Sequence, residues 1–375
     1  MVGAGVIGLA VGWRLAQRGL NVIVLERGDE PARQTSAVAA GMLAPISETL
    51  ATELPLMRLG LASVNAYPDF VDALHDATGM DTGYLRCGTL LAARDADEAE
   101  ALARELTLRQ SLGLTAHRLR ASEARRLEPA LAPTLRLALD VPDDHAIDPR
   151  KLTATLACAL ASASGQLRAG AGVAALTMAG DRVTGVRLAE NGGQITAEHV
   201  VIAAGVWSTQ LDGIPEGARL PIHPVKGQIL RLHDPTGPGL LTRVVRFSGG
   251  YLVPRGDGRY VLGATMEERG FDTTVTAGAV FELLRDGFEL LPSVTELVID
   301  ELSAGLRPST PDNAPAIGAG ALPGLHWATG HFRHGVLLAP ITAQIVAAEI
   351  AGEDPGIAEL EPFAPTRFAD VAVAA

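Results

Sequence analysis

The sequence has little positive charge, and almost all of it is arginine. Lys and Arg together number 31 against 43 Asp and Glu, which gives a formal net charge of −12, and Lys151 and Lys226 are the only lysines. Nucleic-acid binding depends on a basic surface that neutralises phosphates. The charge balance therefore argues against a nucleic-acid partner and indicates nothing specific about a small substrate.

Cysteine and metal-ligand patterns are also scarce. Two widely separated cysteines, Cys87 and Cys158, are too few for a disulfide framework and lack metal-ligand spacing. Cys158 lies in an apolar helical stretch, so we expect it to be a buried small hydrophobe. The nine histidines form no HExxH-type cluster, and we expect no metal site.

Long hydrophobic runs are missing, although 47% of the residues are hydrophobic. Charged residues interrupt every apolar stretch before it reaches the roughly 20 residues of a membrane span. No basic segment followed by an apolar run and a cleavage site opens the chain. We therefore expect a cytoplasmic protein with no membrane partner.

The strongest motif is the glycine turn Gly3-Ala4-Gly5-Val6-Ile7-Gly8, which fits GxGxxG. Apolar residues at helical spacing follow over residues 6–18, and NVIVLE over residues 21–26 predicts a buried parallel strand ending at Glu26. This order predicts a turn that brings backbone and a helix N-terminus to a pyrophosphate, with Glu26 accepting hydrogen bonds from ribose. The alternatives are a glycine-rich turn in an ordinary α/β protein and a surface Glu26. Only two residues precede Gly3, so we expect a shortened or frayed first strand.

The segment after Glu26 distinguishes FAD from NAD. Arg27-Gly28 and then QTSAVAAGM over residues 34–42 supply small and hydroxyl-bearing residues that would close over a second half of the cofactor. An NAD domain usually continues into a helix at this point. The sequence therefore favours FAD.

The remaining pattern predicts two spatial parts built from separate segments. Helices are expected within residues 50–78, interrupted at Pro68, and over residues 95–112, 149–165, 277–291 and 336–349. A hairpin is expected over residues 173–188, a strand at 199–204, and an antiparallel sheet within residues 220–266. Such βαβ pieces at both ends with antiparallel material between them indicate an α/β fold with an α+β second part.

With these residues in place, the chain resembles the D-amino-acid oxidase-like flavoprotein family, and within it the glycine oxidase group of thiamine biosynthesis. Five segments, in family order, carry the resemblance: GAGVIGLAVGWRLA with VLERG, TSAVAAGML, VVIAAGVWS, PVKGQILRL with YLVPR and LGATM, and AGLRPSTPDNAPAIG with ATGHFRHGVLLAP. Together they span nearly the whole chain.

The resemblance implies a glutathione-reductase-like, Rossmann-type FAD-binding domain and a substrate domain whose antiparallel sheet covers the flavin. We assign residues 1–85, 150–218 and 305–375 to the FAD-binding domain and residues 86–149 and 219–304 to the substrate domain. The implied reaction oxidises glycine, sarcosine or D-alanine to an imine by hydride transfer to the flavin, and oxygen is reduced to hydrogen peroxide. A homo-oligomer, often a tetramer in this family, is also implied.

The resemblance and the glycine motif together assign the cofactor residues. These are Gly3, Gly5, Val6, Ile7, Gly8, Glu26, Arg27, Thr35, Ser36, Gly41, Met42, Val173, Gly330, His331, Phe332, Arg333, His334 and Gly335. Related sarcosine oxidases attach FAD through a C-terminal cysteine, but no cysteine follows Cys158 here. We therefore expect non-covalent FAD.

Two residues are candidates for holding a substrate carboxylate. An unpaired carboxylate is very costly to bury, and the planar fork of an arginine can bind it through two charged hydrogen bonds. Arg307, before Pro308 in an extended segment, is the candidate, and the Tyr251 hydroxyl would donate beside it. The alternatives are an Arg307 paired with an acidic neighbour and a Tyr251 packed on the sheet.

Other candidates are Met266 and Met42 as apolar pocket walls and Arg333, whose carbonyl or side chain would reach the flavin or the amine. A helix from near Val336 would point its N-terminus at the flavin. His331 and His334 are expected to be structural or solvent-facing, because hydride transfer from the neutral amine needs no protein base. Gly249 stands where glycine oxidases can carry a histidine, which alters the pocket entrance.

Three further hypotheses stay open at this point. A quinone-linked D-amino-acid dehydrogenase would pass electrons to a membrane acceptor, although no clear membrane-facing patch is visible. A non-catalytic subunit would bind FAD without substrate chemistry, but it would have no need for both Tyr251 and Arg307. An NAD dehydrogenase is disfavoured by the flavin-type C-terminal segment.

Overall fold

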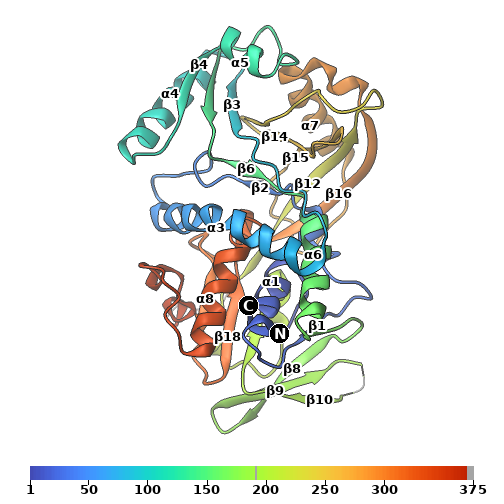
Figure 1. The fold of residues 1–375 in the computed structure, drawn as a ribbon, viewed down its shortest axis with the longest axis vertical. Helices are drawn as coiled ribbons and strands as arrows, with labels where there is room; N and C mark the ends of the chain where they lie inside the picture. The colour runs from blue at the N-terminus through green and yellow to red at the C-terminus, as the bar shows by residue number, and fades with distance from the viewer. Residues whose placement is uncertain (191, 370–375) are drawn as a thin grey trace.

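The computed structural model describes residues 1–190 and 192–369 of the chain. One half of the molecule packs helices against a mainly parallel sheet, and the other half is built on a larger sheet with helices on its outside (Figure 1). This confirms the expected combination of a Rossmann-type part with a mainly antiparallel part. The domain boundaries given above stay a prediction, and the last six residues of the segment 305–375 lie outside the described residues.

The chain forms eight α-helices, eighteen strands and six 3-10 helices within the described residues. The α-helices are α1 (Val6–Gln17), α2 (Thr35–Val38), α3 (Leu54–Thr78), α4 (Ala96–Ser111), α5 (Ala121–Leu127), α6 (Pro149–Ser162), α7 (Ala277–Leu290) and α8 (Ala339–Ala351). The strands are β1 (Ile23–Leu25), β2 (Met42–Leu43), β3 (Thr89–Ala93), β4 (His117–Arg120), β5 (Leu137–Val141), β6 (His145–Ala146), β7 (Gln166–Arg168), β8 (Val173–Ala179), β9 (Arg182–Leu188), β10 (Gln194–Thr196), β11 (Val200–Ile202), β12 (His223–His233), β13 (Val244–Phe247), β14 (Gly250–Pro254), β15 (Arg259–Gly263), β16 (Val298–Ser309), β17 (Ala316–Ala319) and β18 (Leu325–Thr329). The 3-10 helices are η1 (Gly205–Gln210), η2 (Glu216–Ala218), η3 (Pro292–Glu296), η4 (Phe332–His334), η5 (Glu361–Phe363) and η6 (Pro365–Phe368).

The parallel sheet is joined through a single residue, Val2. Its backbone bridges Leu25 of β1 on one side and Ile202 of β11 on the other. Strand β7 pairs with β1, and β18 pairs with β11, all in parallel, while β17 closes the edge in antiparallel direction. The expected shortened first strand is therefore confirmed, and Val2 still joins the two halves of the sheet.

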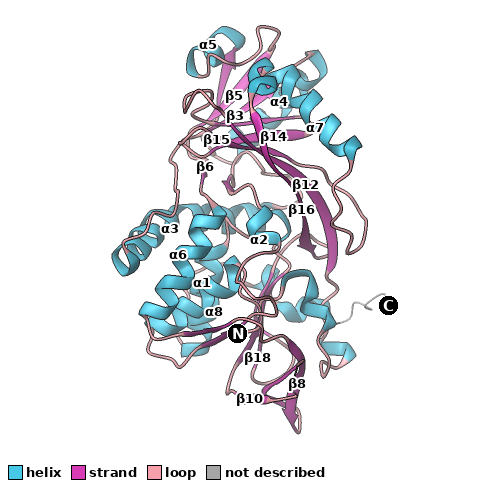
Figure 2. Cartoon of the chain, turned by 90° about the vertical axis from the view of Figure 1, so that its right-hand side faces the viewer, coloured by secondary structure: helices cyan, strands magenta, loops and turns pink. Residues whose placement is uncertain are grey.

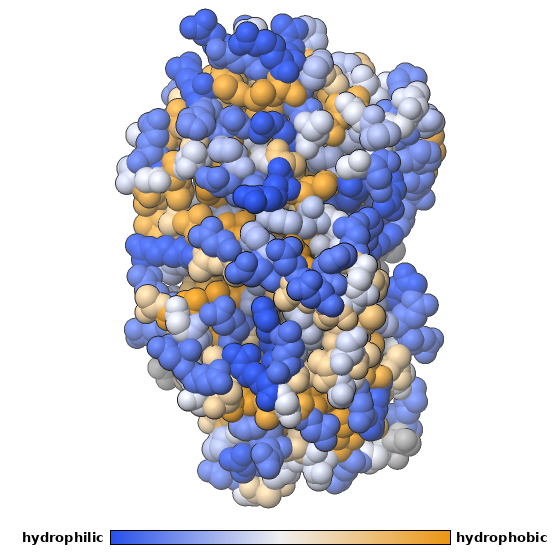
Figure 3. Space-filling view, in the orientation of Figure 1, coloured by the Kyte–Doolittle hydropathy of each residue, from blue (hydrophilic) through white to orange (hydrophobic). Residues whose placement is uncertain are grey.

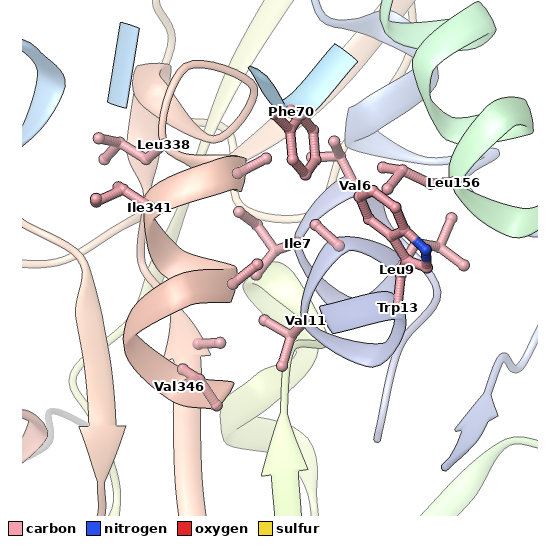
Figure 4. Close-up of a cluster of buried hydrophobic side chains, with 14 of the residues drawn as sticks. Val6, Ile7, Leu9, Val11, Trp13, Phe70, Leu156, Leu338, Ile341 and Val346 are labelled. Atoms are coloured by element: carbon pink, nitrogen blue, oxygen red, sulfur yellow. The ribbon is translucent and has the colours of Figure 1, made fainter. Parts of the chain in front are cut away.

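Helix α1 is buried against this sheet and between the neighbouring helices. Figure 4 shows its side chains, including Ile7 and Val11, facing α8, with Trp13 near Phe70 of α3. Gly12 makes the close approach possible, because a Cβ there would lie 2.9 Å from Cγ2 of Val24. The helix is therefore held by packing on nearly all sides, which fixes the position of its N-terminus.

Phe70 should be one of the most costly core positions to truncate. Its ring is fully buried and meets the ring of Trp13 edge-on at 5.6 Å between centroids. We expect Phe70→Ala to destabilise the protein by roughly 3–5 kcal/mol because it leaves a cavity among fixed neighbours. Thermal unfolding compares it with Phe281→Ala, whose ring is 64% exposed and whose loss should cost at most about 0.5 kcal/mol. Equal shifts in the two variants would contradict this account of the core.

The larger sheet has the order β16-β12-β15-β14-β13-β3-β5-β4. All neighbouring pairs are antiparallel except β13 with β3, which run parallel. Figure 2 shows β12 and β16 as the two long strands that extend from this sheet toward α2. These two strands therefore connect the large sheet to the glycine-turn side of the molecule.

Three local expectations were wrong. Helix α3 runs unbroken through Pro68, because the buried Tyr67, Phe70 and Val71 around it pack against the core and offset the lost hydrogen bond. The last helix begins at Ala339, with Pro340 in its first turn, and not near Val336. Cys158 is exposed, because it lies on the outer side of α6, where it has no core neighbour to pack against.

Figure 3 shows one face of the molecule, on which hydrophilic side chains cover most of the area and hydrophobic ones form separate patches. Among the residues described, no helix combines the length and the apolar character that crossing a membrane requires.

Candidate active site

A cavity of about 560 Å³ lies between the glycine turn and the long strands of the large sheet. Its lining comes from the start of α1, the end of β1, residues 32–42, and one face of β12, β14 and β16. The segment between β18 and α8 closes another side. The cavity therefore joins the dinucleotide motif to the residues expected to meet a substrate.

At the glycine turn, the backbone is packed too closely to hold a side chain at Gly3 or Gly8. A Cβ on Gly8 would lie 2.0 Å from the carbonyl oxygen of Gly3, and a Cβ on Gly3, whose φ is +99°, would lie 2.6 Å from that of Ala203. The Ser36 hydroxyl accepts a hydrogen bond from the Val6 amide at 3.0 Å and so caps α1. The turn is thus the tight, helix-opening bend that pyrophosphate binding requires.

Glu26 is fixed in front of this turn. Its Oε2 accepts a hydrogen bond from the Ala4 amide and its Oε1 from the Gly28 amide, both at 3.0 Å. Arg27 lies over the ring of Trp207 at 3.8 Å, and both side chains line the cavity. A half-buried carboxylate held in this way still has lone pairs for the hydroxyls of a ribose.

The loop over residues 34–42 is anchored to the far side of the cavity. The Thr35 hydroxyl donates to the carbonyl of Leu306 on β16 at 2.7 Å. Gly41 has a φ of +78°, and a Cβ there would lie 2.0 Å from the carbonyl oxygen of Ile147. These contacts hold Met42 at the cavity wall.

Arg307 lies in a trough made by glycine. Gly305 and Arg307 share one face of β16, and Gly305 pairs with Gly227 of β12. A Cβ on Gly227 would lie 2.4 Å from Nη2 of Arg307, so the guanidinium occupies the space that a side chain would fill. Nη1 of Arg307 donates to the carbonyls of Lys226 at 3.3 Å and Thr265 at 3.1 Å. Both of these acceptors are neutral carbonyl oxygens.

Tyr251 of β14 lies beside Arg307. Tyr251 pairs with Gly263 of β15, and Gly263 pairs in turn with Ile229 of β12. A Cβ on Gly263 would lie 2.9 Å from the Tyr251 hydroxyl, so glycine leaves that hydroxyl its room. Burial raises the pKa of Tyr251, and the nearby Arg307 opposes the shift. The hydroxyl therefore stays protonated and able to donate.

A carboxylate that we did not predict, Glu48, also lines the cavity. Its side chain is 10% exposed, with Oε1 at 3.3 Å from Nη2 of Arg246 and Oε2 at 3.4 Å from Nδ1 of His334. Burial pushes the pKa of Glu48 upward, but Arg246, His334, Arg333 and Arg307 together hold it below its usual value. Glu48 is therefore ionised at neutral pH.

The segment after β18 bends sharply into the cavity. Gly330 has a φ of +76°, and Phe332 adopts a φ of +45°, which is a costly conformation for a side chain with a ring. His331 is buried and lies 3.0 Å from the Thr342 hydroxyl. The Arg333 guanidinium lies 3.8 Å from the Glu53 carboxylate and over the Phe332 ring, 5.1 Å from its centroid.

The structure brings most of the predicted residues to this one cavity. Those that line it are Gly3, Gly5, Val6, Ile7, Glu26, Arg27, Thr35, Ser36, Gly41, Met42, Val173, Tyr251, Arg307, His331, Phe332, Arg333 and Gly335. Gly8, Gly330 and His334 support the lining from behind it and are not part of it.

Met266 is placed elsewhere. Its side chain is 62% exposed and is not part of the cavity lining, because it follows β15 in a loop that turns outward. The expectation that His331 and His334 are solvent-facing was also wrong in that respect, since both are buried and hydrogen-bonded or paired. Their structural role stays a prediction.

Neither Gly227 nor Glu48 was among the predicted site residues, and only Gly227 lies in a recognisable sequence pattern. A glycine inside a strand pattern, such as Gly227, indicates close approach of another group and could have been noticed. Glu48 gave no signal, because it lies in an irregular segment whose position depends on Asp144, Arg109 and Arg246 from distant parts of the chain.

His331 should make the protein sensitive to acid. Burial, reinforced by His334, lowers the pKa of His331 to about 3, whereas an unfolded imidazole titrates near 6.5. Between these values the unfolded chain binds a proton that the folded chain excludes, so stability falls as the pH drops from about 6.5. Each unit of pKa difference corresponds to about 1.4 kcal/mol.

We therefore expect His331→Asn to lose less thermal stability than the parent protein between pH 7 and pH 4.5. The exposed His117→Asn serves as the control and should keep the parent's slope. Burial raises the pKa of Asp144 to about 6, so between about pH 4 and 6 this carboxyl makes the folded protein more stable as the pH falls. Because this effect opposes that of His331, the test is the difference between the variants and the parent protein. Parallel slopes for all three proteins would contradict the assignment.

The residues at the glycine-turn end fit FAD. The glycine turn at the N-terminus of α1, the fixed carboxylate of Glu26 and the anchored loop at residues 34–42 offer groups to a pyrophosphate, a ribose and a second half of the cofactor. The cavity extends from there to Arg307, which leaves room for a redox ring system next to a substrate.

Comparisons with known proteins agree with this geometry. The glycine oxidase of Geobacillus kaustophilus is 36% identical over 369 residues, which cover 98% of this chain and 96% of that protein. The crystal structure of glycine oxidase from the same organism superposes with a TM-score of 0.90 at 35% identity and covers 98% of this chain and 97% of that one. The bifunctional protein ThiO/ThiG of Trichormus variabilis is 36% identical over 350 residues. These residues cover 92% of this chain but only 51% of that longer relative.

The family model described as FAD dependent oxidoreductase matches residues 1–349. The resemblance inferred from the five sequence segments is therefore confirmed, and the chain belongs to the FAD-dependent oxidoreductase family that includes the glycine oxidases.

Proposed function

We propose that this protein oxidatively deaminates glycine or a similarly small amine such as sarcosine or D-alanine, with oxygen reduced to hydrogen peroxide. The observation that carries the proposal is the pair Arg307 and Tyr251 at the end of the cavity that begins at the glycine turn. An arginine held by two neutral carbonyls is suited to a substrate carboxylate. The neighbouring glycine oxidase relatives support the choice of substrate.

The cofactor assignments belong to the same proposal. We assign the pyrophosphate to the turn at Gly3 and Gly5, a ribose to Glu26, and the flavin to the region between Met42 and Arg333. FAD supplies the acceptance of two electrons from the amine carbon. The chain's own part is to bind the carboxylate at Arg307, to orient the amine and to exclude water from the half-buried pocket.

The test is anaerobic mixing of the purified protein with glycine, sarcosine and D-alanine while the flavin absorbance is followed, and then admission of air. Bleaching, recovery in air and peroxide formation are the expected results. Bleaching without recovery in air would replace this proposal with the quinone-linked dehydrogenase. A lack of bleaching by all three compounds would place the substrate outside small amino acids.

We also expect the FAD to be bound non-covalently. The two cysteines of the chain are Cys87, which lies outside the cavity lining, and Cys158, which is exposed on α6. Acid precipitation should therefore release the flavin into the supernatant, and Cys87→Ser should behave like the parent protein. Flavin that stays with the precipitated parent protein would contradict the expectation, and its release from Cys87→Ser would then identify Cys87 as the point of attachment.

Several wider assignments stay predictions. The division into an FAD-binding and a substrate domain is supported by the large sheet, whose strands come from residues 89–141 and 223–309. The homo-oligomer, the cytoplasmic location and a place in thiamine biosynthesis are predictions from the sequence and its resemblance.

A further inference from the structure

Glu48 has a position that the proposed reaction has not yet used. The carboxylates that line the cavity, among the described residues, are Glu26, Glu30, Glu48 and Asp212. Glu26 is held at the glycine turn, and Glu48 is the carboxylate whose charge acts on both Tyr251 and Arg307. Glu48 is thus a negative group at the substrate end of the cavity.

Glu48 is held in place by a buried network that does not involve its own side chain. The amides of Ile46 and Ser47 donate to Asp144 at 3.0 and 2.7 Å. The carbonyls of the same two residues accept hydrogen bonds from Arg109, whose side chain is 1% exposed. Such a rigid backbone fixes the direction of the next side chain, which is the condition for precise recognition.

The charges around the pocket are paired unevenly. Arg246 has Glu48 at 3.3 Å and Arg333 has Glu53 at 3.8 Å, while the hydrogen bonds of Arg307 go to neutral carbonyls. A simple monocarboxylate would satisfy Arg307 but would also meet the negative charge of Glu48. An α-amino acid carries a positive amine one carbon away from its carboxylate and would satisfy both groups.

We propose, building on the proposed function, that Glu48 accepts the substrate amine and together with Arg307 forms a pair of opposite charges that selects amino acids over plain carboxylates. The ammonium form of the bound substrate is stabilised by the ionised carboxylate of Glu48, and this form must lose a proton before oxidation. Glu48 therefore contributes to both selectivity and the pH dependence of the reaction.

Glycine and acetate form a matched pair of probes, because they differ only by the amine. The holoenzyme is reduced with dithionite so that glycine binds without being oxidised, and both dissociation constants are measured by anaerobic calorimetry. In Glu48→Gln we expect glycine to bind at least about tenfold more weakly and acetate to bind unchanged or up to several-fold more tightly. A loop that is merely misplaced would weaken both ligands together, and that outcome would overturn the proposal.

Two further measurements keep the test independent of folding. Glu48→Asp retains the charge and should restore the preference for glycine over acetate at least in part, whereas failure to do so with intact acetate binding would count against a role of the charge. In Glu48→Gln the pH at which kcat is half-maximal should fall by about one unit, since the amine loses its proton more readily; an unchanged profile would contradict the proposal.

The outcomes also separate this inference from the proposed function. If the parent protein is bleached by glycine but Glu48→Gln binds glycine as tightly as the parent, only the assignment of Glu48 fails. If glycine, sarcosine and D-alanine all fail to bleach the parent protein, the proposed function fails and the assignment of Glu48 fails with it.

Discussion

Replacing Arg307 by Ala should reduce kcat/KM for glycine by about 10²–10⁴-fold and abolish measurable acetate binding, while the protein keeps its FAD. The estimate follows from two charged hydrogen bonds to a carboxylate at about 1.5–3 kcal/mol each. Arg307 lines the cavity from β16, whereas the glycine turn lines it from the start of α1, so the loss should fall on the substrate and not on the cofactor. Steady-state kinetics and the flavin-to-protein ratio measure the two effects.

Arg307→Lys and Gly227→Ala sharpen this prediction. The lysine keeps the charge but loses the planar fork, so its kcat/KM should lie between those of the parent and the alanine variant. A methyl group on Gly227 would come within 2.4 Å of the guanidinium, so Gly227→Ala should displace Arg307 and weaken acetate binding although it removes no charge. Arg259→Ala is the control, because that side chain is exposed and pairs with Asp257 outside the cavity. Unchanged acetate binding in Arg307→Ala would refute the carboxylate assignment.

The nucleotide-binding end of the site could be read from the sequence because it is local. The turn, α1, β1 and Glu26 lie within 26 consecutive residues, and the hydrogen bonds from Ala4 and Gly28 to Glu26 span at most 22 positions. Glycines at fixed spacing and one strand fix most of this geometry. Even the short first strand could be anticipated, because Val2 is the residue that remains before the turn.

The substrate end depends on strand register across four segments, and the sequence does not encode that register locally. Tyr251 reaches Arg307 only because β14, β15, β12 and β16 are neighbours in the sheet. Gly227 then leaves room for the Arg307 guanidinium, and Gly263 leaves room for the Tyr251 hydroxyl. The pairing of Arg307 with Tyr251 came from the family resemblance, and Glu48 lies outside every segment that carried it.

The errors have a common physical origin in tertiary packing. Pro68 was expected to interrupt a helix, but the buried aromatic residues beside it keep α3 continuous. The start of α8 moved to Ala339, because the preceding residues form η4 and carry backbone carbonyls bound by Ser63 and Tyr67. Met266 follows a strand in which the residues from Tyr260 to Gly263 are buried, and the outward turn of its loop cannot be read from LGATM alone.

The substitution Gly5→Asp, which places a carboxylate at the start of α1, should weaken FAD binding without lowering the thermal stability of the apoprotein. Gly5 is the N-cap residue of α1, with φ −73° and ψ −180°, so an L-residue fits its backbone. Asp is a favourable N-cap residue, and a Cβ at this position would meet only the Ser36 hydroxyl at 3.2 Å, which can rotate away. The apoprotein of Gly5→Asp should therefore unfold at a temperature close to that of the parent apoprotein.

FAD binding by the same variant should be weakened at least about 100-fold, because the new carboxylate faces the pyrophosphate at the helix N-terminus. Like charges about 4 Å apart repel by roughly 4 kcal/mol at an intermediate dielectric constant, which alone corresponds to about 10³-fold. Fluorescence titration of the apoprotein with FAD measures the effect. Gly8→Ala is the contrasting variant: its methyl group would collide with the Gly3 carbonyl at 2.0 Å, so it should lose thermal stability as well as FAD. If Gly5→Asp were purified with a full complement of flavin, the pyrophosphate could not lie at the start of α1, and the cofactor would have to enter the cavity in another orientation.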